Sequence, residues 1–73
     1  MSPSQIILTR LEELTAARGW PLVRTAELRR AVERDGVVGE SFDSSMLTLE
    51  ALDLIDLFHG REGLYHVARA GLI

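Results

Sequence analysis

A change of apolar periodicity in the last third of the chain restricts the fold more than any other feature. Before residue 54, apolar residues recur at three- and four-residue intervals, which is the spacing of amphipathic helices. The runs 54–59 and 64–67 then consist of β-prone residues on either side of a turn framed by Gly60 and Gly63. We therefore predict helices followed by a C-terminal β-hairpin. If residues 54–59 instead prolonged the last helix, a helical bundle would replace the hairpin.

Capping residues and apolar spacing together predict three helices. The first opens on a capping box formed by Ser2 and Gln5, and Gly19 ends it. Thr25 is a suitable N-cap for the second helix, and Gly36 stops that helix. The third helix is expected to bury one face, made of Phe42, Ser45, Met46, Leu49 and Leu52.

The predicted hairpin register places Phe58 opposite Tyr65 as a cross-strand aromatic pair. The core-facing side then carries Ile55, Leu57, Leu64 and Ala68. The outer side carries Asp56, Phe58, Tyr65, Val67 and Arg69. His59 and His66 share one face in this register, but two histidines without a third ligand do not predict a metal site.

The length of 73 residues suits a single domain, residues 1–73, near the lower limit for folding without metal or disulfide. An apolar fraction of 47% allows a small core, and Trp20 before Pro21 is expected to close that core over the end of the first helix. The absence of cysteine excludes disulfides, thiolate catalysis and cysteine-based zinc sites. The apolar end, Leu72-Ile73, fits a last strand, a dimer contact or a boundary inside a longer protein.

The sequence predicts a protein that is not an enzyme. It lacks lysine as well as cysteine, and it has no Gly-rich loop followed by lysine. A chain this small has little room for a buried pocket, so we expect no cofactor, no metal and no small-molecule substrate. No stretch has the length of a membrane span, and the N-terminus lacks the layout of a signal peptide. We therefore expect a cytoplasmic protein without membrane contact.

Charge is distributed unevenly along the chain. All eight basic residues are arginines. Residues 1–35 and 61–73 each carry a small excess of arginine, whereas residues 36–60 carry five carboxylates and no Lys or Arg. An acidic segment repels the phosphates of nucleic acids. The middle of the chain, which includes the third helix, is therefore unsuited to phosphate contact.

The order of the elements resembles that of the winged helix-turn-helix superfamily. The resemblance is carried by Thr25-x-x-Leu28, by Phe42-x-x-x-Met46-x-x-Leu49-x-x-Leu52, and by the tip between Gly60 and Gly63. It covers roughly residues 6–69, and it implies an α+β winged helix with a three-helix core and a C-terminal β-hairpin, the wing. In DNA-binding members, the exposed face of the third helix enters the major groove and the wing touches a neighbouring phosphate.

The outward face of the predicted third helix is the first candidate site. It consists of Asp43, Ser44, Leu47, Thr48, Glu50 and Ala51. Without flanking Arg or Lys, its carboxylates would face phosphates unfavourably in a DNA groove. An outward Leu47 with polar neighbours is typical of a small protein-contact patch. A solvated helix face with one exposed leucine is the alternative, and base recognition is a further one.

The arginines around the second helix form the second candidate site. These are Arg24, Arg29, Arg30 and Arg34. Together with Arg61 on the predicted wing, they offer a surface for a nucleic-acid backbone that would not read sequence. Glu27 and Glu33 lie among them, so ion pairing within the helix is the competing interpretation.

These observations favour a small non-catalytic interaction domain of a nucleic-acid-associated or regulatory system, which contacts protein through its acidic third helix. A protein partner or a homodimer is favoured over DNA. The first alternative is a DNA-binding transcriptional regulator that uses the arginines of the second helix and the wing. The second alternative is a dimerisation module joined through the apolar C-terminus or an edge strand.

Overall fold

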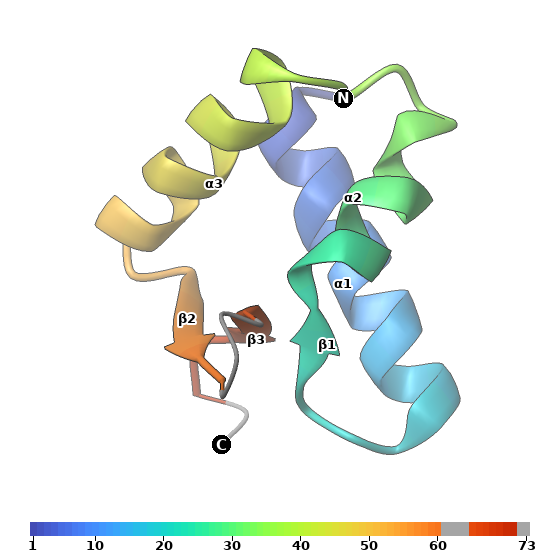
Figure 1. Ribbon diagram of the computed structural model, residues 1–73, viewed down its shortest axis with the longest axis vertical. Helices are drawn as coiled ribbons and strands as arrows, with labels where there is room; N and C mark the ends of the chain where they lie inside the picture. The colour runs from blue at the N-terminus through green and yellow to red at the C-terminus, as the bar shows by residue number, and fades with distance from the viewer. Residues whose placement is uncertain (61–64, 72–73) are drawn as a thin grey trace.

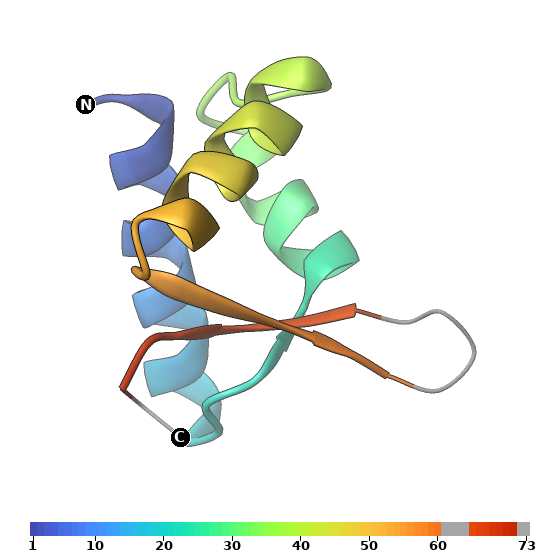
Figure 2. The ribbon, with the colours of Figure 1, turned by 90° about the vertical axis from the view of Figure 1, so that its left-hand side faces the viewer.

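The computed structural model describes residues 1–60 and 65–71, which form three helices and a three-stranded antiparallel sheet (Figure 1). The elements are α1 (Pro3–Arg18), β1 (Val23–Arg24), α2 (Thr25–Glu33), α3 (Glu40–Ala51), β2 (Ile55–His59) and β3 (Tyr65–Arg69). In Figure 2, α2 and α3 lie above the sheet and α1 runs past it from behind. The predicted α+β domain with a C-terminal hairpin is confirmed, and the strand at residues 55–59 excludes the helical-bundle alternative.

The ends of α1 follow the predicted capping chemistry. Ser2 Oγ accepts the backbone N–H of Gln5 at 3.3 Å, and the Gln5 side chain accepts the backbone N–H of Ser2 at 3.2 Å. Gly19 ends the helix in the left-handed conformation, with a φ of 64°. The N-cap of α2 is Arg24 instead of the expected Thr25, because β1 passes directly into a helix that begins at Thr25.

Every helix and strand contributes a buried side chain to one core. The buried members are Ile7, Leu11, Val23, Leu28, Val32, Val37, Phe42, Met46, Leu49, Ile55 and Val67. Trp20 is not among them, because 61% of its surface is exposed, so its predicted role as a core plug is wrong. The backbone N–H groups of Gly19 and Trp20 both bond the C=O of Thr15, which turns the chain at the end of α1. Val23, three residues later, enters the core instead.

The end of α3 decides which of its leucines are buried. The N–H of Asp53 bonds the C=O of Glu50 at 3.0 Å, and the N–H of Leu54 bonds the C=O of Leu49 at 2.9 Å. Together with the positive φ of 63° at Asp53, these bonds form a Schellman motif with Asp in the place usually taken by glycine. Leu52 therefore leaves the helical repeat and exposes 62% of its surface, so its predicted burial is wrong.

The hairpin register differs by one residue from the prediction. Phe58 lies opposite His66, and Leu57 lies opposite Val67. Because side chains alternate between the faces of a strand, a shift of one residue exchanges the two faces of β3. This shift places Val67, which is fully buried, in the core, so the predicted pairing of Phe58 with Tyr65 is wrong.

Other face assignments change with the register. Arg69 moves to the helix-facing side of the sheet, and Ala68 takes the other face, where it is nevertheless fully buried. His59 and His66 lie on opposite faces instead of sharing one. Leu64, which was predicted to face the core, lies outside the described residues.

Candidate functional site

The exposed face of α3 agrees with the sequence prediction. Its six predicted residues are all exposed: Asp43, Ser44, Leu47, Thr48, Glu50 and Ala51. The opposite side of the helix is anchored in the core by Phe42, Met46 and Leu49, and the helical repeat then fixes which residues point outward. Leu47 exposes 67% of its surface. The helix therefore presents a polar, acidic surface that contains one outward leucine.

A groove lies next to Leu47, between α2, α3 and β2. It encloses about 280 Å³ and is lined by Thr25, Arg29, Phe42, Asp43, Met46, Leu47 and Leu57. Its apolar members come from α3 and from β2, which are brought together only in the folded chain. The Thr25 hydroxyl is buried here without a hydrogen-bond partner among the described residues. The sequence identified Leu47 but not the groove, because no local pattern relates Leu57 to α3.

Arg29 connects the two candidate sites, the outward face of α3 and the arginines around α2, which were predicted as separate surfaces. Its guanidinium donates to Asp43 Oδ1 at 2.8 Å and lies 4.5 Å from the centroid of the Phe42 ring. Both charged side chains are substantially exposed, so we expect this ion pair to contribute no more than about 1 kcal/mol. Its main consequence is positional, because the pair holds a cation over an aromatic ring at the groove wall. Arg29 is thereby occupied by a carboxylate of the protein itself.

The other described arginines of the second candidate site lie on the surface of the protein. Arg24, Arg30 and Arg34 are exposed, and the structure records no ion pair for them with any carboxylate of residues 1–60 or 65–71. Arg34 lines a different hollow, together with Arg10 and Leu14 of α1. Arg61 lies outside the described residues.

The ion pairs of α2 run between elements, in contrast to the predicted pairing within the helix. Glu27 pairs with Arg18 at the end of α1, and Arg29 pairs with Asp43 of α3. These contacts tie α2 to both neighbouring helices. The helical spacing of charges suggested local pairs, but the partners that the fold supplies come from other helices.

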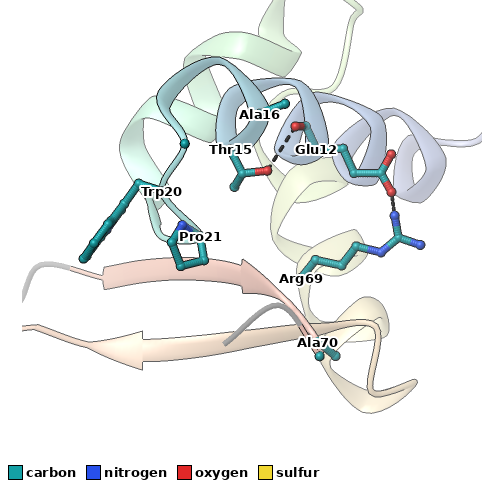
Figure 3. Close-up of a pocket in the computed structure, with 9 residues that line it drawn as sticks. Glu12, Thr15, Ala16, Trp20, Pro21, Arg69 and Ala70 are labelled. Carbon is teal, nitrogen blue, oxygen red and sulfur yellow. Dashed lines mark hydrogen bonds and ion pairs between the residues drawn. The ribbon is translucent and has the colours of Figure 1, made fainter.

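A second hollow surrounds the exposed Trp20 at the end of α1. It encloses about 480 Å³, between the Trp20-Pro21 turn and the end of β3 (Figure 3). Arg69 reaches across it to form an ion pair with Glu12 of α1. This pair occupies the charged groups that line the hollow, so Trp20 remains as its exposed aromatic surface. A tryptophan directly after a helix-ending glycine was the available sequence signal for this exposure.

A third cluster joins α1 to the junction between α2 and α3. Arg10 Nε donates to Asp35 Oδ2 at 2.9 Å, and its two terminal nitrogens donate to Asp35 and Glu13 at 3.3 and 2.8 Å. The hydrogen bonds from Arg10 hold the pKa of the Asp35 carboxyl below its ordinary value. Each of these three charged side chains is hydrogen-bonded to another member of the cluster. The cluster therefore holds α1 in position and is not a candidate reactive site.

The described residues contain no group of three or more His, Cys, Asp or Glu side chains arranged to hold a metal ion. Within the same part of the chain, no helix is both long enough and apolar enough to cross a membrane. No family model, curated protein or solved structure matches this chain. Function is therefore inferred from the surface itself, and the α3 face with its adjoining groove is the candidate site.

Proposed function

We propose that this chain is a winged-helix domain without catalytic activity, and that it binds another protein through the exposed face of α3 and the adjoining groove. The element order supports the winged-helix assignment, because a helical core is followed by a hairpin beyond α3. In DNA-binding members with this arrangement, the helix in the position of α3 contacts the DNA. The chemistry of its outward side chains then decides which partner is suitable.

The observation that carries the proposal is the position of Leu47 beside the groove. A leucine with 67% of its surface exposed lines the same hollow as Phe42, Met46 and Leu57. Burial of an apolar partner side chain in such a hollow is the usual anchor of a protein interface, with polar residues at its rim. Asp43, Ser44 and Thr48 supply polar groups around Leu47.

Charge supports protein contact over nucleic acid. Five carboxylates and no Lys or Arg occur between residues 36 and 60, and Arg29 is held by Asp43. A nucleic acid laid on α3 would bring its phosphates against this negative surface. Protein binding meets no such obstacle. The domain is therefore proposed to act in a regulatory or nucleic-acid-associated assembly through protein contacts.

The proposal can be tested by selecting binders from a display library of short random peptides. Leu47→Ser should weaken binding of the selected peptides by about tenfold or more, as expected when an anchoring side chain is lost. Val38→Ser is the matched control, because Val38 is also an exposed apolar residue but does not line the groove. Equal effects of the two substitutions, or failure to select any binder, would contradict the proposal.

Titration with mixed-sequence duplex DNA at about 50 mM salt tests the alternative directly. We expect no binding at micromolar concentrations. Binding that weakens steeply with added salt and is lost in an Arg24→Ala/Arg30→Ala variant would instead support phosphate recognition. The dimerisation alternative predicts that the molecular mass in solution rises with protein concentration.

A further inference from the structure

The strand β2 lies at one edge of the sheet. The strand order is β1-β3-β2, so β2 pairs with β3 on one side only. In Figure 2, β2 passes in front of β3, and no described segment covers its near side. An edge strand exposes a row of backbone donors and acceptors that another chain can pair with. This edge lies directly below the C-terminal half of α3 (Figure 2).

The pairing of β2 with β3 shows which backbone groups face outward. The N–H of Ala70 bonds the C=O of Leu54 at 3.1 Å, which fixes the phase of the ladder. Because hydrogen-bonded pairs alternate in an antiparallel ladder, the backbone groups of Asp56 and Phe58 turn toward β3. Those of Leu57 turn toward the open edge, where the structure records no partner for them among the described residues.

Apolar side chains accumulate beside this edge. Leu54 and Phe58 of the β2 region are exposed, and so is Leu47 of α3. Leu57 belongs to the groove that Leu47 also lines. A strand added alongside β2 would direct alternate side chains to the face of Leu57 and Leu47, and the others to the face of Phe58.

The negative charge beside the edge of β2 favours an added strand that carries basic residues. Glu50, Asp53 and Asp56 lie on the last turn of α3, in the following turn and on β2 itself, and none has an ion pair among residues 1–60 and 65–71. The last turn of α3 contains no basic residue that would offset the negative end of its helix dipole. A second copy of the chain would oppose this acidic surface with an identical one, which is unfavourable.

We propose that an extended segment of the partner protein, with alternating apolar and basic residues, pairs with the open edge of β2 as a fourth strand. This inference rests on the proposed protein-binding function and specifies how the partner is held. Backbone hydrogen bonds to Leu57 hold the segment in place, its apolar residues contact Leu47 and Leu57, and its basic residues face the carboxylates.

Hydrogen exchange of the free protein gives the first test. The amide of Leu57 should exchange about tenfold or more faster than those of Asp56 and Phe58, which face β3. Equal protection of the three amides in the monomer would show that the edge is already closed and would overturn the proposal. If the protection of Leu57 rose with protein concentration together with the molecular mass, a second copy would be the occupant instead.

Peptides selected against the domain give the second test. N-methylation of one alternate set of backbone nitrogens in a selected peptide should weaken binding by about tenfold or more, whereas methylation of the other set should leave it nearly unchanged. A helical peptide in the groove would lose its internal hydrogen bonds with either set, which would overturn the strand-pairing mode while leaving the protein-binding function intact. Failure to select any binder counts against the protein-binding function itself.

Side-chain substitutions separate charge recognition from backbone pairing. Glu50→Gln and Asp56→Asn should each weaken binding of the selected peptides severalfold and reduce its dependence on salt. Glu33→Gln, an exposed carboxylate at the end of α2, is the matched control and should have no effect. Loss of binding that is equal at all three positions would show that net charge alone, and not the edge of β2, attracts the peptide.

Discussion

Three leucines of the α3 region provide a direct test of the structure, because the same substitution should be costly at one position and nearly neutral at the other two. Leu49 is 1% exposed, whereas Leu47 and Leu52 expose 67% and 62% of their surfaces. Replacement of a buried leucine by alanine removes its contacts and leaves a cavity, which costs about 2–5 kcal/mol. Replacement of an exposed leucine changes the free energy of unfolding by about 0.5 kcal/mol or less.

The expected effects are large relative to the total stability. A domain of 73 residues is stabilised by about 4–11 kcal/mol, so Leu49→Ala should remove a major part of it. At about 4–8 °C per kcal/mol for a domain of this size, a loss of about 2–5 kcal/mol in Leu49→Ala should lower the Tm by about 8–40 °C. Leu47→Ala and Leu52→Ala should each shift the Tm by a few degrees at most. Urea unfolding followed by circular dichroism measures the free energy of unfolding of all three variants under the same conditions.

Leu52→Ala is the variant that can refute the reasoning. A helix that continued past Ala51 would bury Leu52 on the same face as Leu49, as the sequence repeat predicts. A loss of more than about 1.5 kcal/mol for Leu52→Ala would therefore show that α3 is longer than described and that the Schellman motif at Asp53 is absent. A loss confined to Leu49→Ala would establish the end of α3, on which the position of the β2 edge depends.

Further predictions concern the ion pairs and Trp20. A double-mutant cycle with Arg29→Ala and Asp43→Ala should give a coupling energy of about 1 kcal/mol or less that falls with added salt; a larger value would contradict a surface pair. The pKa of Asp35 is lower in the folded state, so its stabilising contribution is present above its ordinary pKa and is lost as pH falls through the folded value. In Asp35→Asn, the free energy of unfolding should therefore fall less steeply as the pH is lowered. An unchanged fall at acidic pH would exclude the Arg10 contact. Trp20 fluorescence in the native state should be quenched by acrylamide nearly as strongly as in urea, and a protected native signal would show that Trp20 is buried.

The elements of the fold could be predicted because each is specified by residues close together in the sequence. The capping box of Ser2 and Gln5, for example, acts within a few residues of where it stands. The register of the hairpin could not be predicted in the same way. Ala68 and Val67 are both apolar, so alternation alone does not say which of them faces the helices. Contact with Val23 of β1, more than forty residues earlier, accompanies the burial of Val67.

The candidate site, too, could be predicted from the sequence only in part. The outward face of α3 follows from helical periodicity, and its six residues could be named from the sequence. The groove and the Arg29–Asp43 pair depend on how α2 packs against α3, which no local pattern specifies. The prediction for Trp20 was wrong because large aromatic residues are usually buried. That expectation ignores the turn that the Gly19 and Trp20 backbone bonds impose.

The turn at Asp53 connects the end of α3 to both parts of the proposed interface. It stops the helix before Leu52 and turns the chain into β2, so apolar side chains that a longer helix would have buried remain outside the core. The same turn places the open edge of β2 below α3 (Figure 2), whose last turn contains no basic residue to offset the negative end of its helix dipole. A surface with exposed leucines, free backbone groups and uncompensated carboxylates is poorly suited to a duplex of phosphates. It is well suited to an extended protein segment with basic and apolar residues. Such a segment can cover the leucines, bond the free backbone groups and pair with the carboxylates at once.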